Sequence, residues 1–371
     1  MNKCRIGVLT SGGDCAGLNP TMKWIVKTAL DERLNWERGT QYEVLGIRDG
    51  FKGLVSTDTS SIDIEGHIVT LNQELVRTWD RIGGSFLGTS RLSPYDSQNN
   101  QSQTVIDNIA RLGIEALIVI GGDGSLAIAS RLSDEGVNVI GIPKTIDKDL
   151  PETEYTLGFD TALNVITEEV DRLRTTAGTH KRIFVVETMG RTAGWLALEG
   201  GEASGALIIL IPEYPFSMSK VNELVLEAKR AGARYEIIIV AEGAKLEGGE
   251  EFVKTLGVDA FGHKALGGVA EFVAREIHNG TKLETRSVVL SHLQRGGAPS
   301  AHDRRMGRYF GITAIDLIDR REFGKMVGYK NGRITPCSLK NIYGKLNLVD
   351  IETQYDTERL NGRRTVLGRI T

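Results

Sequence analysis

Two glycine-rich turns in the first third of the chain carry the residue types that bind phosphate groups. One turn, 11–14, follows a short apolar run, and the other, 121–125, follows a later one. Glycines allow backbone N–H groups to approach an anion where a helix begins directly afterwards. The first turn has the spacing of neither a G-x-G-x-x-G motif nor a Walker A loop. Two such turns suit a polyphosphate, although turn formation alone is the alternative for each.

Charged residues near these turns extend the phosphate hypothesis. Asp123, within the second turn, is a candidate Mg²⁺ ligand, since magnesium usually takes one or two carboxylates together with phosphate oxygens. The alternative is an aspartate that only stabilises the turn. Arg81 and Arg91 flank the glycine-rich loop 83–88, and guanidinium groups there can fork onto phosphate oxygens. The alternative for both arginines is a solvated surface position.

Two aspartates, Asp147 and Asp149, follow a third apolar run in the segment 143–149. In an extended segment they face the same way, and Asp147 is the candidate general base. Phosphoryl transfer to a hydroxyl needs an aspartate that accepts the hydroxyl proton and cations on the moving phosphoryl group. Lys144 is the candidate cation here. A charged loop held by local salt bridges is the alternative.

Further charged residues lie near the ends of later apolar runs. Arg191 follows one run and is a candidate for charge neutralisation in a transition state, while Glu242 closes another. Two arginines and a histidine surround the run 287–290 and resemble a clamp for a phosphomonoester. They are Arg286, His292 and Arg295. The alternative for the arginines is a surface position, and a histidine such as His292 is more often structural.

The elements that must position these residues are short apolar runs alternating with longer segments of helical spacing. Fully apolar runs predict parallel strands covered by helices on both faces. In such sheets ligands bind beyond the carboxyl ends of the strands, where the turns described above lie. The predicted strands are 6–9, 44–47, 116–120, 137–142, 183–186, 206–211, 237–241 and 287–290, and the predicted helices include 20–30, 105–112, 125–132, 161–173, 221–231 and 269–278.

Length and composition indicate a globular protein of two domains, since the chain has 371 residues. Forty-five basic against 48 acidic residues give a formal net charge of −3, so no global field recruits nucleic acid or an acidic membrane. The apolar runs are too short for a membrane helix. Three cysteines without C-x-x-C spacing predict no disulfide framework or zinc site and fit the cytoplasm.

The segment 150–158 is the predicted first crossover between domains, and the tail after about residue 331 offers no motif.

The order of the motifs resembles the phosphofructokinase family from about residue 3 to residue 310. The motifs are L-T-S-G-G-D at 9–14, G-G-D-G-S at 121–125, P-K-T-I-D-K-D at 143–149, M-G-R at 189–191 and H-L-Q-R-G-G at 292–297. NAD kinases and lipid kinases also carry G-G-D-G, but five ordered motifs leave little room for coincidence. The resemblance implies an α/β fold of two Rossmann-like three-layer domains with mainly parallel sheets.

The resemblance also implies which parts of the chain do what. The nucleotide-binding domain would comprise residues 1–158 with about 294–344, and the sugar-phosphate domain 159–293 with about 345–371. The ATP phosphate site, with Asp123 as the magnesium ligand, would comprise Gly12, Arg81, Arg91, Gly121, Gly122, Asp123, Gly124 and Ser125. Catalysis would involve Lys144, Thr145, Asp147 as proton acceptor and Arg191. The sugar-phosphate contacts would be Thr145, Asp147, Asp149, Met189, Gly190, Arg191, Glu242, His292 and Arg295.

Two further arginines bear on assembly. Arg182 and Arg286 match family positions that reach into the site of a neighbouring subunit. The resemblance therefore implies a homodimer or a homotetramer whose sites are shared between subunits.

Three positions bear on the substrates. In this family, glycine at the position of Gly124 goes with ATP, whereas aspartate there goes with pyrophosphate because it crowds and repels the α-phosphate. Lys144 is typical of pyrophosphate users, although ATP-dependent members combine the same glycine and lysine. Gly124 has more weight, since a lysine does not remove the room for a nucleotide. Lys148 replaces the usual asparagine, and a cation beside Asp147 is expected to lower the pKa of that base.

The expected activity is phosphorylation of fructose 6-phosphate at its 1-hydroxyl by MgATP, a step of glycolysis that gives fructose 1,6-bisphosphate and ADP. The alternatives within this class are a pyrophosphate-dependent enzyme and a kinase of another sugar phosphate, such as sedoheptulose 7-phosphate. A nucleotide-binding oxidoreductase is disfavoured by the missing G-x-G-x-x-G motif with a later acidic residue. A catalytically inactive regulatory subunit is disfavoured because Asp123, Asp147 and Arg191 are all present.

Overall fold

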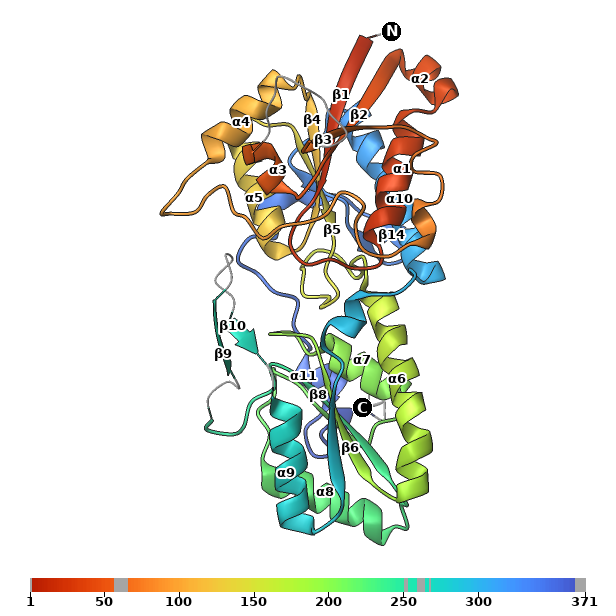
Figure 1. Ribbon diagram of the computed structural model, residues 1–371, viewed down its shortest axis with the longest axis vertical. Helices are drawn as coiled ribbons and strands as arrows, with labels where there is room; N and C mark the ends of the chain where they lie inside the picture. The colour runs from red at the N-terminus through yellow and green to blue at the C-terminus, as the bar shows by residue number, and fades with distance from the viewer. Residues whose placement is uncertain (1, 57–65, 250–252, 259–263, 267, 364–371) are drawn as a thin grey trace, which may run out of the picture.

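The computed structural model describes residues 2–56, 66–249, 253–258, 264–266 and 268–363. These residues form two lobes, each built around a sheet that carries helices on both faces (Figure 1). Most strand pairs in both sheets are parallel. The α/β fold with mainly parallel sheets, predicted from the apolar runs, is confirmed.

The first lobe contains a seven-stranded sheet in the order β15-β12-β5-β4-β1-β2-β3. Its inner strand pairs are parallel, and β3 and β15 run antiparallel at the two edges. Ile6 and Val8 on β1 join one apolar cluster and Leu9 joins the other, because successive residues of a strand face opposite sides. The strands are β1 (Asn2–Thr10), β2 (Thr40–Ile47), β3 (Ile68–Leu71), β4 (Ala116–Gly121), β5 (Val139–Pro143), β12 (Lys325–Met326) and β15 (Cys337–Ser338).

Helices bury both faces of this sheet. α1 and α10 pack together on the side of Ile6, and α3, α4 and α5 pack on the side of Leu9 (Figure 1). The helices are α1 (Leu18–Ala29), α2 (Glu32–Arg38), α3 (Phe51–Ser56), α4 (Ser102–Arg111), α5 (Asp123–Asp134) and α10 (Ala301–Asp319), with the 3₁₀ turns η1 (Trp79–Arg81) and η3 (Leu339–Asn341) and the hairpin β13 (Tyr329–Lys330) and β14 (Arg333–Ile334).

The second lobe contains a four-stranded parallel sheet in the order β11-β6-β8-β7. α6 and α7 pack together, as do α8 and α9, so the sheet lies between two helical layers (Figure 1). The strands are β6 (Ile183–Thr188), β7 (Ile208–Leu210), β8 (Glu236–Ala241) and β11 (Thr285–Val289). The other elements are α6 (Phe159–His180), α7 (Trp195–Ala203), α8 (Met218–Arg230), α9 (Val269–Thr281), η2 (Ser291–Arg295), α11 (Ile351–Gln354), β9 (Val253–Val258), β10 (Lys264–Leu266), β16 (Tyr355–Asp356) and β17 (Asn361–Gly362).

A buried carboxylate fastens the first crossing between the lobes to α10. Asp303 is fully buried and accepts hydrogen bonds from the Tyr155 hydroxyl at 2.6 Å, the Gly158 amide at 2.7 Å and the Thr161 amide at 3.0 Å. Gly158 has a φ of 96°, and a Cβ there would lie 2.4 Å from the Cys15 Cβ. Only glycine fits such a position without rearrangement.

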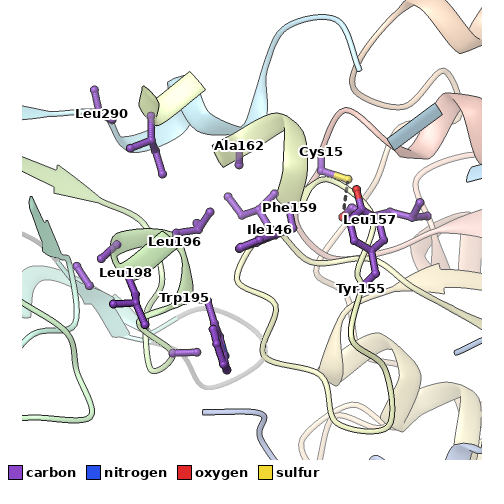
Figure 2. Packing of buried hydrophobic residues seen from close by; sticks show 14 of the residues in the cluster. Cys15, Ile146, Tyr155, Leu157, Phe159, Ala162, Trp195, Leu196, Leu198 and Leu290 are labelled. Atoms are coloured by element: carbon purple, nitrogen blue, oxygen red, sulfur yellow. Dashed lines mark hydrogen bonds between the residues drawn. The ribbon is translucent and has the colours of Figure 1, made fainter. Parts of the chain in front are cut away.

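Apolar packing continues across this crossing. Figure 2 shows Leu157, Phe159, Ala162, Trp195 and Leu196, which belong to one buried cluster that extends from the first lobe into the second. Such burial removes apolar surface from water and holds the lobes together. Among the described helices, none is both long enough and apolar enough to cross a membrane.

Candidate active site

A pocket lies where the carboxyl ends of β1, β4 and β5 meet the loop after β6. The three strands are neighbours in one parallel sheet, so the segments that follow them emerge at the same edge. The pocket brings together many of the residues predicted from the sequence. Its lining is Gly12, Gly13, Arg91, Gly122, Asp123, Gly124, Ser125, Lys144, Thr145, Asp147, Asp149, Arg191 and Arg295.

The two glycine turns form one wall of this pocket. Gly12 has a φ of 84°, which is the left-handed region. Gly121 ends β4, and a Cβ there would lie 2.3 Å from the Ser125 Cβ, so the turn can close only around glycine. α5 begins directly after Gly122, which has no side chain to cap the first amides of the helix. Free N–H groups at a helix N-terminus favour a bound anion.

Lys144 lies beneath the first turn rather than in open solvent. Its side chain is 3% exposed, and its ammonium donates a hydrogen bond to the Gly13 carbonyl. Burial lowers the pKa of Lys144 to about 8, because a buried ammonium loses its hydration. Lys144 lines the same pocket as Asp123. Lys144 therefore brings positive charge to the side of the pocket that the glycine turns form.

Asp147 and Asp149 both line the pocket, although the segment that carries them is a turn with Lys148 at a φ of 55° and not the extended segment considered from the sequence. Each has an Oδ1 atom that is buried without a hydrogen-bond partner among the described residues. The Asp147 amide donates to the Thr145 Oγ1 at 3.1 Å. Burial raises the pKa of Asp147, and burial together with the charge of Asp147 raises the pKa of Asp149 to about 7. Two buried carboxylates this close cannot both ionise easily.

Two cations face these carboxylates. Arg191 lies in the loop between β6 and α7, and Arg295 ends η2 and donates to the Asp14 carbonyl at 3.0 Å. Both guanidinium groups lower the pKa of Asp147, though less than burial raises it. Glu242 follows β8 close by, and burial, followed by the charge of Asp147, raises its pKa to about 7.

The expectation that the Lys148 cation would leave Asp147 with a lowered pKa is wrong. The pKa of Asp147 is raised, because desolvation of the carboxylate outweighs the attraction of the nearby cations. The Lys148 ammonium does not line the pocket and instead lies 2.6 Å from the Glu199 Oε1 atom. Lys148 has a φ of 55°, in the left-handed region.

Some residues named from the sequence lie outside the pocket. Arg81 is exposed on η1, and His292 is exposed with its Nδ1 atom 3.0 Å from the Ser291 Oγ. Met189 and Gly190 follow β6 beside the pocket without lining it. The two remaining arginines pair with Glu284 near the amino ends of their strands, at the opposite edge of the sheet. They are Arg182, at 2.9 Å, and Arg286, at 2.8 Å.

Two residues near the site were not predicted as site residues: Gln294, which lies inside the motif at 292–297 but was given no role, and Asn347, which had no distinguishing signal in the sequence. Gln294 is 1% exposed, accepts a hydrogen bond from the Met189 amide at 3.3 Å and donates to the Ser291 carbonyl at 3.1 Å. Asn347 lies in the tail that offered no motif, yet it binds the carbonyl of Lys148 at 2.8 Å. Within the described residues, no three His, Cys, Asp or Glu side chains are arranged to hold a metal ion by themselves.

Comparisons with known proteins of similar sequence and structure show the family of this chain. Residues 5–318 match the family described as phosphofructokinase. A pyrophosphate–fructose 6-phosphate 1-phosphotransferase of Dictyoglomus thermophilum is 44% identical over 355 residues, 94% of this chain and 96% of that protein. ATP-dependent 6-phosphofructokinase 3 of Streptomyces coelicolor is 40% identical over 345 residues, 93% and 96% respectively. The T-state phosphofructokinase of Pichia pastoris has a TM-score of 0.78 at 30% identity, over 92% of this chain and 38% of that one. This chain therefore belongs to the phosphofructokinase family.

Proposed function

We propose that this protein transfers the γ-phosphoryl group of ATP to the 1-hydroxyl of fructose 6-phosphate. The observation that carries the proposal is the Asp147 carboxylate, which shares one pocket with the glycine turns and Arg191 and has a buried Oδ1 atom without a partner. Leaving a buried acceptor unpaired costs free energy, and a substrate hydroxyl is a donor that would satisfy it. The relatives described above support the acceptor, since both are named for phosphoryl transfer to fructose 6-phosphate or for the phosphofructokinase reaction.

The residues of the pocket supply the proton transfer and the charge that this reaction requires. The hydroxyl oxygen forms a bond to the γ-phosphorus, the bond from that phosphorus to the bridging oxygen breaks, and ADP leaves. The hydroxyl proton passes to Asp147, whose raised pKa brings it closer to the working pH, where a general base is most effective. Arg191 and Lys144 neutralise charge on the moving phosphoryl group.

The nucleotide side of the pocket fits a Mg²⁺ ion. Asp123 lies at the start of α5, and its charge raises the pKa values of Asp147 and Asp149. A carboxylate beside a phosphate-binding turn is the donor set that magnesium uses, because the phosphate oxygens complete its coordination. Asp123 would hold the ion, which when bound supplies positive charge at the phosphate oxygens.

The acceptor side combines segments from both lobes. Arg295 is the pocket's candidate for the sugar phosphate, with Thr145 and Asp149 beside it. The remaining proposed contacts follow strands of the second lobe and are Met189, Gly190, Glu242 and His292. Because the Lys148 ammonium is bound to Glu199, it gives no reason to replace fructose 6-phosphate by sedoheptulose 7-phosphate.

Pyrophosphate is the second candidate donor, and Lys144 is the observation that favours it. Relatives under both names match nearly the whole chain at similar identity, so overall similarity does not separate the donors. Gly124 lines the pocket at the first turn of α5 without a side chain that would exclude a nucleotide. Lys144 is tied to the Gly13 carbonyl beneath the turn, so it leaves that room open. We therefore assign ATP as the donor.

The decisive experiment is a coupled assay of the purified protein with fructose 6-phosphate and Mg²⁺. Saturating ATP and saturating pyrophosphate are compared, with Asp147→Asn as the inactive control. We expect turnover with ATP. Turnover with pyrophosphate alone would make Lys144 the determinant of the donor, and no turnover with either donor would contradict the proposed reaction.

We also propose two domains, 1–158 with about 294–344 and 159–293 with about 345–371, of which 364–371 lie outside the described residues. The division is supported by β12, β15 and α10, which pack in the first lobe, and by α11, which lies in the second (Figure 1). Arg182 and Arg286 lie away from their own pocket, as residues that serve a neighbouring subunit would. We therefore propose a homodimer or homotetramer with shared sites. Light scattering tests this oligomeric state.

The three free cysteines support a cytoplasmic location.

A further inference from the structure

Lys148 has a backbone conformation that lysine rarely adopts. Its φ is 55°, in the left-handed region, and it stands between the two pocket aspartates. Such conformations persist only where the surrounding structure holds them. The turn has a direct geometric effect, since Asp147 and Asp149 line the pocket and Lys148 does not. Whatever holds this turn therefore also holds two carboxylates in place.

The side chain of Lys148 is bound by the first residues of two helices of the second lobe. Its Nζ atom lies 4.6 Å from the centre of the Trp195 ring, where α7 begins, and 5.1 Å from that of Phe159, where α6 begins. It also lies 2.6 Å from the Glu199 Oε1 atom, one turn along α7. An ammonium between two aromatic rings and a carboxylate gains cation–π attraction in addition to the ion pair. Figure 2 shows Phe159 and Trp195 at the junction of the lobes.

The backbone on either side of Lys148 is held by the same helix through a second route. Asn347 donates from its Nδ2 atom to the Lys148 carbonyl and from its amide to the Asp149 carbonyl, both at 2.8 Å. The Asn347 carbonyl in turn accepts a hydrogen bond from the Trp195 Nε1 atom at 2.8 Å. Side chain and backbone of the turn thus both lead to Trp195 at the start of α7.

We propose that Lys148 is a positioning residue, which fixes the Asp147 and Asp149 carboxylates in the pocket by anchoring their turn to α7. The inference rests on the proposed function, because Asp147 is the base of that reaction. Arg191 lies four residues before the start of α7. The anchor therefore also sets the base, which comes from the first lobe, relative to the cation that comes from the second.

The first test removes the ammonium while keeping the length of the side chain. Lys148→Met should lower kcat by about tenfold while the KM for ATP stays within about twofold of wild type, because the base is displaced and the phosphate turns are not. Lys148→Arg should restore most of the rate, since a guanidinium can pair with Glu199 and stack on Trp195. Glu199→Gln should lower kcat less, and the double variant should be no slower than Lys148→Met alone.

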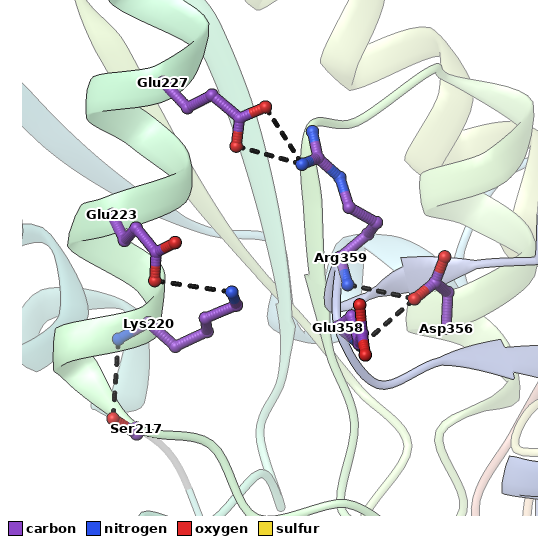
Figure 3. Close-up of polar contacts among 7 residues, drawn as sticks. All are labelled: Ser217, Lys220, Glu223, Glu227, Asp356, Glu358 and Arg359. Atoms are coloured by element: carbon purple, nitrogen blue, oxygen red, sulfur yellow. Dashed lines mark hydrogen bonds and ion pairs between the residues drawn. The ribbon is translucent and has the colours of Figure 1, made fainter.

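The matched control is a lysine–glutamate pair far from the pocket. Lys220 lies on α8 with its Nζ atom 3.3 Å from the Glu223 Oε2 atom (Figure 3). Lys220→Met should leave kcat and KM unchanged. Equal kinetic parameters in Lys148→Met and Lys220→Met would overturn the inference.

A second variant separates positioning from folding. Glycine adopts a positive φ without strain, so Lys148→Gly should remain folded, with a cooperative thermal transition, while losing the anchor. We expect it to lose kcat as Lys148→Met does. A wild-type kcat in Lys148→Gly would show that the anchor has no effect on the base, and the inference would be wrong.

A third measurement does not depend on activity. Hydrogen–deuterium exchange of residues 144–150 should be faster in Lys148→Met and Lys148→Gly than in the wild type, because the turn loses its anchor. Unchanged exchange overturns the inference whatever the wild type catalyses. If exchange is faster in the variants but the wild-type protein has no activity with ATP or with pyrophosphate, the proposed function is overturned and the positioning role of Lys148 is not.

Discussion

The two sides of the pocket are built from different parts of the polypeptide. On the side of the first lobe, the groups proposed to bind phosphate belong largely to the backbone, in the turns after β1 and β4 and at the start of α5. On the side of the second lobe, the pocket is lined by the side chain of Arg191, on the loop after β6, and the buried Glu242 follows β8 nearby. A backbone site is complete within one lobe, whereas the side-chain site depends on how the second lobe meets the first.

The largest effect is expected at Asp147, where the two sides meet. Asp147→Asn keeps the shape of the side chain but cannot accept the hydroxyl proton, so kcat should fall by about 10²–10⁴-fold with little change in either KM. Steady-state kinetics measure this. Asp107, which is exposed on α4, supplies the control, since Asp107→Asn should behave as wild type. A variant at Asp147 that keeps most of its turnover would show that the base lies elsewhere.

The second lobe is tested at Arg191. Arg191→Met removes the cation proposed to face the moving phosphoryl group, and kcat should fall by about 10²-fold. The exposed Arg172→Met, on α6, supplies the control. If Arg191→Met instead raised the KM for fructose 6-phosphate at unchanged kcat, Arg191 would only bind substrate, and the chemistry would belong to the first lobe alone.

The backbone side is tested at Gly124. Gly124→Asp adds a carboxylate to the first turn of α5, where it should crowd and repel a nucleotide. The KM for ATP should rise by about tenfold or more, while any turnover with pyrophosphate should not decrease. The comparison uses both donors on the same preparation. Equal loss with both donors would mean that the substitution only disturbs the turn.

The smallest effect is expected on stability, at Glu242. Burial raises its pKa from the ordinary 4.5 to about 7, so the folded protein binds the proton more tightly than the unfolded chain. The free energy of unfolding then falls as the pH rises between these values. Glu242→Gln removes this loss and should stabilise the protein by about 1–3 kcal/mol at pH 8, but not at about pH 4.5, where the wild type carries no penalty.

Urea denaturation at both pH values measures the effect, with the exposed Glu358→Gln as the control. A variant at Glu242 that is no more stable at the higher pH than wild type would show that Arg191 compensates the buried charge fully.

The difference between the two sides also explains what the sequence could predict of the site. The glycine turns and Asp147 were recognisable because their function requires particular residue types at fixed local spacing. The direction of the Lys148 side chain could not be predicted, since it depends on Trp195 and Glu199, about 50 residues later in the chain. Asn347 likewise acts through backbone carbonyls that any residue would offer, so nothing in its own neighbourhood marks it.

The fold shows the same division between local and distant determinants. Strands such as β4 were predicted because a parallel strand buried on both faces must be apolar throughout. The helix α10 was not named among the example helices predicted from the sequence, and its glycines weaken the local signal for a helix. A Cβ at Gly307 would lie 2.8 Å from the Thr21 Oγ1, and one at Gly311 2.9 Å from the Ile25 amide. The close contact between α10 and α1 therefore requires residues that weaken the local helix signal.

The position of β12 beside β5 has a consequence for the order in which the protein is made. β5 ends at residue 143, whereas β12 and its partner β15 come from residues 325–338, after the whole sheet of the second lobe. During synthesis, β5 is therefore an open edge of the first sheet until the ribosome has passed these residues. Open edges can pair with other chains. Premature termination between the two segments leaves that edge exposed, so such fragments should aggregate or be captured by chaperones.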